Sequence, residues 1–255
     1  MNNTSTTHQG FKLAGLWKSR RLIGFNVIVL LLITTWLVPS TRFFWDILDQ
    51  KAFLALNKWI QTNPYWQTFW AMANHKNTDW LFDAIILYFI GSYIYHAPSH
   101  LKLRRLCEVT FTIILTASTI LLVNRFLFRD IITIYRESPS LVTPMATLLN
   151  TVVPWMETKT SARFSFPGDH ATTALMFIFA MNLLLDRPKA FFATLIGIFF
   201  ILPRLIIGAH WLTDILIGSL SITMFIIAWT FYTPLYHTFV TKMENILRTA
   251  TKRKT

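Results

Sequence analysis

Blocks of apolar residues recur along the chain, and polar or charged segments separate them. Each block approaches or meets the roughly 20 residues that a helix needs to cross a bilayer. Six such blocks in one chain favour a membrane bundle over the buried helices of a soluble core. We therefore predict an all-α fold, a six-span transmembrane helical bundle, with spans at residues 22–38, 80–95, 109–123, 171–185, 190–207 and 215–232.

The segments between the predicted spans contain further helical patterns. Apolar residues in 43–60 follow rough helical spacing, which predicts an amphipathic helix lying in the membrane interface. Residues 142–155 predict a second interfacial helix. The chain then divides into a cytoplasmic N-terminal tail at 1–21, a six-span membrane domain at 22–232 and a basic cytoplasmic tail at 233–255.

Composition agrees with this pattern, and charge adds an orientation. The chain is 53% hydrophobic with a mean hydropathy of +0.44, and its net charge is +12. With both termini cytoplasmic, the inner segments hold fourteen of the 24 Lys and Arg and three acidic residues, whereas the outer segments hold nine of each sign. This is the positive-inside asymmetry of membrane proteins. The basic charge therefore indicates orientation in an anionic membrane and argues against a nucleic-acid partner.

The sequence predicts neither a metal nor a cofactor. Cys107 is the only cysteine, which excludes an intramolecular disulfide and a cysteine metal site. The carboxylates are too few and too scattered for a two-metal site.

The candidate chemistry centres on Arg204, followed after five residues by His210 and after three more by Asp214. Residues four apart share one face of a helix, so Asp214 can accept from one nitrogen of His210 and leave the other free to attack. Gly208 allows a break, so that Arg204 ends one helix and His210 begins the next.

Two other stretches reach the same outer face in this topology. His170 opens the fourth span, directly after Gly168 and Asp169, and Arg129 and Arg136 begin the segment that leads there. Arginine forks pair with phosphate oxygens, and the free N–H groups of a helix start bind anions. Two histidines can divide the work, one attacking phosphorus and the other protonating the leaving oxygen. The residues alone therefore predict lipid phosphate chemistry at the outer face.

At these positions the chain resembles the type 2 phosphatidic acid phosphatase superfamily, whose motifs are K-x6-R-P, P-S-G-H and S-R-x5-H-x3-D. The resemblance covers roughly residues 79–232 and implies a phosphatase-type catalytic domain. It implies that His210 is the nucleophile, Asp214 its orienting partner and His170 the general acid. It also implies that Arg129, Arg136 and Arg204 bind phosphate. We place Gly168 and Asp169 at the same phosphate site, because they stand at the helix start.

The chain departs from the family motifs at several positions. Arg129 stands where lysine is usual, and Arg125 is an alternative counterpart. Gly168 removes a serine hydroxyl, and Asp169 adds a negative charge beside an anion site. Pro203 replaces the serine before the third-motif arginine.

With these departures the chain resembles a bacterial branch of the superfamily, which transfers a phosphate from undecaprenyl diphosphate to the 1-phosphate of lipid A. The stretches that carry this resemblance are S-F-P-G-D-H, P-R-x-x-I-G-A-H-W-x-T-D-I and R-x-S-P. That resemblance implies lipid A 1-diphosphate and undecaprenyl phosphate as products, with the site at the periplasmic face of the inner membrane. Arg125 and Arg163 would add charge suited to a diphosphate product.

Such a helical bundle is also compatible with three functions other than phosphate transfer between lipids. A plain lipid phosphatase would pass the phosphate from His210 to water. A transporter would need ionisable residues near the middle of the spans, and none recurs there. A lipid-binding protein without activity would not need the complete set of His170, His210 and Asp214. The sequence does not indicate an oligomeric state.

Overall fold

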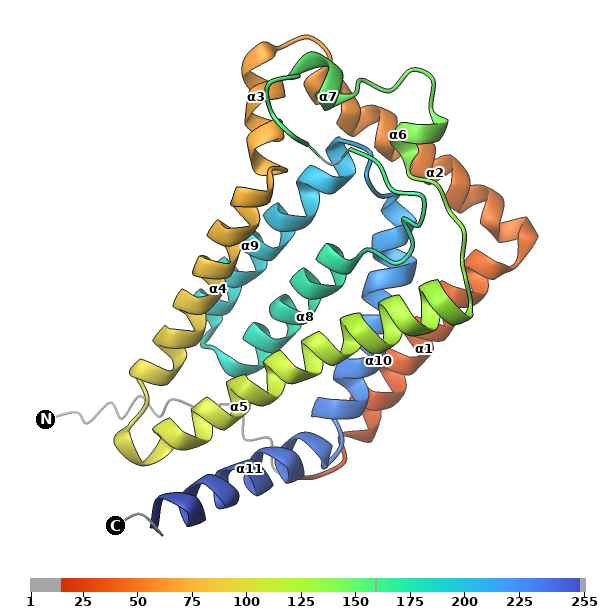
Figure 1. Cartoon of the computed structure of the whole chain (residues 1–255). Coiled ribbons are helices and arrows are strands. Elements are labelled where there is room, and N and C mark those ends of the chain that lie inside the picture. The colour runs from red at the N-terminus through yellow and green to blue at the C-terminus, as the bar shows by residue number, and fades with distance from the viewer. Residues whose placement is uncertain (1–14, 159, 253–255) are drawn as a thin grey trace, which may run out of the picture.

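The computed structural model describes residues 15–158 and 160–252, and over these residues the chain is a bundle of helices without a strand (Figure 1). The all-α prediction is confirmed. The elements are α1 (Ser19–Leu37), α2 (Pro39–Asn57), the 3-10 helix η1 (Lys58–Ile60), α3 (Pro64–Ala73), α4 (Lys76–Tyr95), α5 (Ser99–Ser118), the π-helix η2 (Thr119–Ile131), α6 (Pro139–Val142), α7 (Leu149–Val152), α8 (Asp169–Leu184), α9 (Arg187–Ile206), the π-helix η3 (Asp214–Ser219), α10 (Leu220–Phe231) and α11 (Leu235–Lys252).

Four of the described helices are long and apolar enough to cross a membrane. They are α1, α5 continued by η2, α9, and η3 continued by α10. The two remaining predicted spans fall on α4 and α8. Helix α8 has 16 residues, and α4 begins with the charged residues Lys76, Asp79 and Asp83. Length and composition therefore support four of the six predicted spans, and a six-span bundle stays a prediction.

Helix α8 is the central element of the bundle, with α4 and α9 on one side and η2 and α10 on the other (Figure 1). It is apolar on all sides, which is typical of a helix surrounded by other helices. Gly197 of α9 permits the close approach of α8, because a Cβ there would lie 2.5 Å from Ile178 Cγ1. Met176, Phe177 and Ala180 of α8 belong to the main apolar core.

The short helices α3, α6 and α7 gather with part of α2 at one end of the bundle, which we call the loop end (Figure 1). A second core holds η1, α3 and α7 there against the end of α9, through residues that include Ile60, Trp70, Leu149, Val153 and Ile206. Helix α11 lies at the opposite end (Figure 1). The loop end is therefore a packed cap over the ends of the long helices.

Two predicted elements differ in the structure. Residues 142–155 form no single helix, because α6 ends at Val142 and α7 begins only at Leu149. Thr143 is extended, as expected for a residue before a proline, here Pro144. The predicted tails are described only in part, since 1–14 and 253–255 lie outside the described residues.

The predicted break at Gly208 is confirmed. Helix α9 ends at Ile206, and Gly208 has a φ of +76°, which favours glycine. The next helix begins later than predicted, since η3 starts at Asp214 and His210 lies in the connecting segment. The N–H groups of Ala209 and His210 both donate to the carbonyl of Arg204, which prolongs the turn after α9.

Candidate active site

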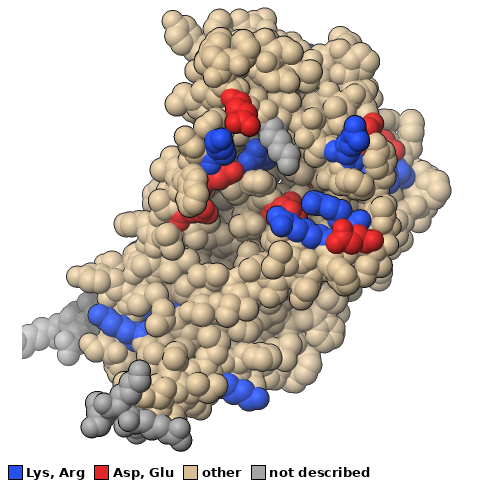
Figure 2. Space-filling model, in the orientation of Figure 1, with Lys and Arg blue, Asp and Glu red and all other residues tan. Residues whose placement is uncertain are grey.

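A cavity of about 240 Å³ lies at the loop end, where η2, the start of α8 and the end of α9 meet. On the face shown in Figure 2, acidic and basic side chains gather around a hollow in this part of the molecule. The residues lining the cavity are Arg125, Arg129, Ser161, Ala162, Phe164, Pro167, Asp169, His170, Arg204, Ala209 and His210. The predicted convergence of distant histidines and arginines is thus present in the structure.

Four of the predicted site residues do not line this cavity: Gly168, Arg163, Arg136 and Asp214. Gly168 instead packs against the ring of His210, because a Cβ there would lie 3.4 Å from His210 Cε1. Arg163 is next to the lining residues Ala162 and Phe164 without lining the cavity itself. The other two form a buried network, described below.

His210 is oriented mainly by a backbone carbonyl. Its Nδ1 lies 2.8 Å from the Ser165 oxygen and 3.6 Å from Asp214 Oδ2. A carbonyl can only accept, so Nδ1 carries the proton and Nε2 keeps its lone pair. Asp214 is therefore the more distant partner, a difference from the prediction that it is the direct one.

Asp214 and Arg136 form a buried network behind His210. Asp214 is fully buried, and its Oδ2 accepts from the Trp211 N–H at 2.8 Å. Its Oδ1 accepts from Nη1 of Arg136, which also donates to Thr213 Oγ1 at 2.8 Å. Arg136 thus faces Asp214 and does not line the cavity. The sequence predicts instead that Arg136 contacts the phosphate directly.

Asp49 of α2 completes this network and was not found from the sequence. Its carboxylate accepts from Arg136 Nη2 at 2.5 Å, and from the N–H and Oγ1 of Thr213 at 2.8 and 2.6 Å. Burial raises the pKa of the Asp49 carboxyl, and Arg136 and Thr213 only partly offset that effect. One signal could have revealed it: Asp49, Phe53 and Asn57 are spaced by four and are the buried residues of α2.

His170 is the second residue of α8, and its partners also come from distant elements. Its Nε2 lies 3.2 Å from Arg204 Nη2 and 3.6 Å from Asp79 Oδ2. Arg204 is held in turn by Asp79 Oδ1 at 3.2 Å and by the buried Asn74 side chain. Neither Asp79 nor Asn74 was predicted as a site residue, because both precede every motif in the sequence.

Asp169 balances the two arginines of η2. Its Oδ2 lies 3.2 Å from Arg125 Nε and 3.8 Å from Arg129 Nη2, and its Oδ1 accepts from Asn124 at 3.2 Å. Both arginines line the cavity, so each can face an anion there. The cavity also adjoins the start of α8, whose first N–H groups have no side-chain cap and favour an anion.

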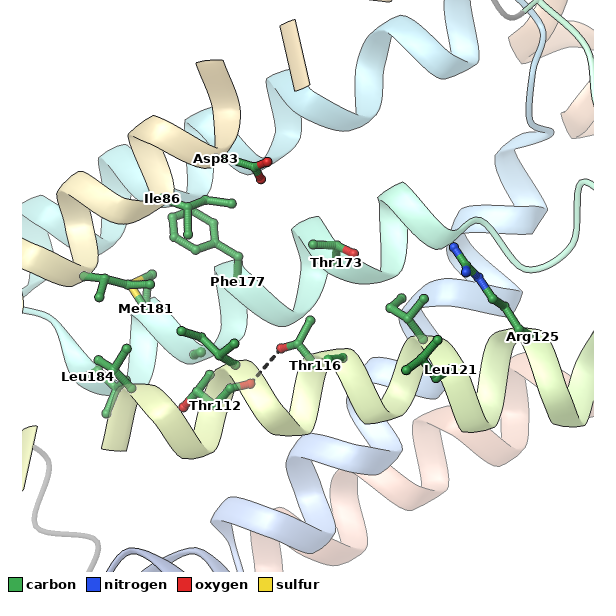
Figure 3. A pocket seen from close by; sticks show the side chains of 16 residues that line it. Asp83, Ile86, Thr112, Thr116, Leu121, Arg125, Thr173, Phe177, Met181 and Leu184 are labelled. Atoms are coloured by element: carbon green, nitrogen blue, oxygen red, sulfur yellow. Dashed lines mark hydrogen bonds between the residues drawn. The ribbon is translucent and has the colours of Figure 1, made fainter. Parts of the chain in front are cut away.

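A second, apolar cavity of about 460 Å³ adjoins the first and lies among α4, α5, η2 and α8. Figure 3 shows Arg125 at one end of it and Leu184 toward the other, with Phe177 and Met181 between them. Arg125 lines both cavities. We call this space the α4–α8 groove. A charged head at the arginines and an apolar chain in the groove would both find matching surfaces.

The sequence is also similar to known proteins. Residues 136–239 match the model of the PAP2 superfamily. That segment includes His170, Arg204, His210 and Asp214, while Arg125 and Arg129 precede it.

A curated relative is similar over most of the chain. Lipid A 1-diphosphate synthase of Escherichia coli (strain K12) is 28% identical over 237 residues, which cover 89% of this chain and 93% of the relative. Both comparisons agree with the resemblance seen in the motifs. Among solved structures, none matches the chain.

Proposed function

We propose that this protein is a membrane lipid phosphotransferase that moves a phosphate from undecaprenyl diphosphate to the 1-phosphate of lipid A. The observation that carries the proposal is His210, held by Ser165 through Nδ1 and lining a cavity with Arg125, Arg129, Arg204 and His170. The similarity to lipid A 1-diphosphate synthase supports the choice of lipids.

The first half-reaction transfers the phosphate to the enzyme. The lone pair of His210 Nε2 forms a bond to the terminal phosphorus while the bond to the leaving oxygen breaks, and protonated His170 donates its proton to that oxygen. The phosphate oxygens would be bound by Arg125, Arg129, Arg204 and the N–H groups at the start of α8. Asp214, backed by Arg136, would stabilise the phosphorylated imidazole.

The second half-reaction uses the 1-phosphate of lipid A as nucleophile. Its oxygen forms a bond to phosphorus, the P–N bond breaks, and the electron pair returns to His210. If the attacking phosphate is a monoanion, His170 takes its proton and is ready for another turnover.

A lipid substrate fits the surroundings of the site. The α4–α8 groove is apolar and shares Arg125 with the catalytic cavity, so one molecule can place a phosphate in the cavity and a hydrocarbon chain in the groove (Figure 3). Its volume of about 460 Å³ is within the range of ligand pockets, roughly 300–1,000 Å³.

The proposal includes the predicted membrane arrangement. Helices α4 and α8 run between the same two ends of the bundle as the four candidate spans (Figure 1), which supports six spans in all. Both termini would be cytoplasmic, α2 would lie in the interface, and the cavity would open at the periplasmic face of the bacterial inner membrane.

The test uses purified protein and undecaprenyl diphosphate labelled on its terminal phosphate. With lipid A present, the label should appear on lipid A and undecaprenyl phosphate should accumulate. His210→Ala should abolish both products and the labelled protein. If inorganic phosphate is released at full rate without acceptor and lipid A stays unlabelled, the protein is a lipid phosphatase.

A further inference from the structure

Asp79 stands at the second catalytic histidine although no motif contains it. It lies in the first turn of α4, a helix whose start is fixed by the His75 side chain accepting from the Asn77 N–H at 3.2 Å. Both carboxylate oxygens accept from Arg204 Nη2, Oδ1 at 3.2 Å and Oδ2 at 3.5 Å, and Oδ2 also lies 3.6 Å from His170 Nε2. Helix α4 therefore brings a carboxylate to residues of α8 and α9.

The geometry around His170 Nε2 offers a partner for each protonation state. When Nε2 carries no proton, it can accept a hydrogen bond from Arg204 Nη2 at 3.2 Å. When Nε2 carries a proton, it can no longer accept, and Asp79 Oδ2 is the nearby acceptor. A cation and a carboxylate thus act in opposite directions on the same proton.

We propose that Asp79 is the positioning residue of His170, which holds its protonated form ready before each phosphoryl transfer. The inference rests on the proposed chemistry at His210 but does not depend on which lipid accepts the phosphate. Protonated His170 gives its proton to the leaving oxygen as that P–O bond breaks. The neutral ring then accepts from Arg204 until the attacking nucleophile returns a proton to it.

Other charged groups face the same space as Asp79. Arg204 of α9 contacts His170 directly, and Arg125, Arg129, Asp169 and His210 line the cavity that His170 also lines. Asp169 is engaged by the two η2 arginines, with 3.2 and 3.8 Å separations. Asp79 is therefore the carboxylate that is left to balance Arg204 at His170 Nε2.

The test is Asp79→Asn, which keeps the size of the side chain and removes its charge. Formation of undecaprenyl phosphate from undecaprenyl diphosphate, the first half-reaction, is followed from pH 5 to pH 9 (about one pH unit per step). With Arg204 unopposed, the protonated form of His170 is lost more readily, so the alkaline limb of kcat/KM should move down by about one pH unit. At neutral pH kcat should fall on the order of tenfold, whereas KM should not rise because Arg204 keeps its charge.

Two further variants separate this role from a structural one. Asp79→Glu should restore the position of the alkaline limb, since it restores the charge. Glu157→Gln removes an exposed carboxylate that pairs with Lys76 at the start of the same helix, and should leave the profile unchanged.

Several outcomes contradict the inference. A profile for Asp79→Asn that superimposes on that of the unmodified protein overturns the inference, as does a uniform loss at every pH that Asp79→Glu does not restore. An unmodified protein that forms no phosphohistidine overturns the proposed function and this inference together, so the two failures are distinguishable.

Discussion

At the scale of single residues, the site is built from charges that hold one another before any substrate arrives. Behind His210, Arg136 lies between the carboxylates of Asp49 and Asp214, and all three side chains are largely buried. Removing one member of such a network leaves an uncompensated buried charge, which costs far more than the loss of a surface ion pair. Arg136 therefore acts in our proposal by positioning Asp214.

This role predicts the behaviour of Arg136→Gln. The variant leaves two buried carboxylates without their cation, and we expect it to lower the free energy of unfolding by about 3–5 kcal/mol. Adding Asp49→Asn should recover part of that loss, because one of the unpaired carboxylates is then removed. Denaturant unfolding of the single and double variants in detergent measures the coupling.

A surface pair provides the control. Asp46→Asn breaks the exposed Arg42–Asp46 ion pair of α2, at 2.8 Å, leaves Arg42 on the Trp36 ring, and should cost no more than about 1 kcal/mol. If Arg136→Gln unfolds like this control while KM for the lipid diphosphate rises, Arg136 binds phosphate directly and the positioning role is wrong.

At the scale of elements, the turn between α9 and η3 decides where His210 lies. Gly208 has a positive φ, and a Cβ there would lie 2.6 Å from Phe53 Cε2 and 3.0 Å from the Ser140 backbone nitrogen. Its carbonyl also accepts from the Ser140 N–H at 3.1 Å. The turn is thus fixed between α2 and α6 as well as by the chain itself.

Gly208→Ala should accordingly destabilise the protein by more than about 1 kcal/mol, since both the conformation and the space exclude a side chain. Activity should fall further than stability, because His210 follows only two residues later. Gly91→Ala is the matched control, as its Cβ would meet nothing within 4 Å in helix α4, and it should be neutral or slightly stabilising. Thermal unfolding and turnover distinguish the two variants, and equal effects would contradict the proposed importance of the turn.

The α4–α8 groove is also a feature of packed elements. Ala117 lines it with an exposed side chain, so Ala117→Trp should narrow the groove without disturbing the core. We expect KM for undecaprenyl diphosphate to rise on the order of tenfold, with little change for a short-chain diphosphate such as farnesyl diphosphate.

Ile114→Trp, on an exposed position of the same helix that does not line the groove, should have no such effect. Steady-state kinetics with both diphosphates measures the difference. Equal KM values for both chain lengths in Ala117→Trp would show that the chain binds elsewhere.

At the scale of the whole molecule, the proposed topology places the loop end outside and α11 inside. Cys107 is a poor reporter of that arrangement, because it is buried. In a Cys107→Ala background, a cysteine replacing the exposed Glu157 should react in intact cells with a membrane-impermeant thiol reagent. A cysteine replacing the exposed Arg187, the first residue of α9, should react only after the cells are opened. The reverse pattern would invert the molecule in the membrane.

The sequence by itself determined the features that depend on local spacing. Apolar blocks predicted the helical class, because a helix needs only a run of suitable neighbours. Gly208 predicted the break after Arg204, since a positive φ is a property of one residue. Phosphate chemistry followed from the kinds of residue at the motif positions, and the family comparison agrees with it.

Only the tertiary structure decided which groups touch. The carbonyl oxygen of Ser165 contacts His210, which is 45 residues away in the sequence. Asp49 contacts Thr213 across 164 residues of sequence, and Asp79 contacts Arg204 across 125 residues. None of these pairs leaves a local pattern, because their proximity results from how α2, α4 and the loop end pack on α8 and α9. The same packing turned Arg136 toward Asp214 and away from the cavity lining, an orientation that its spacing from Arg129 could not reveal.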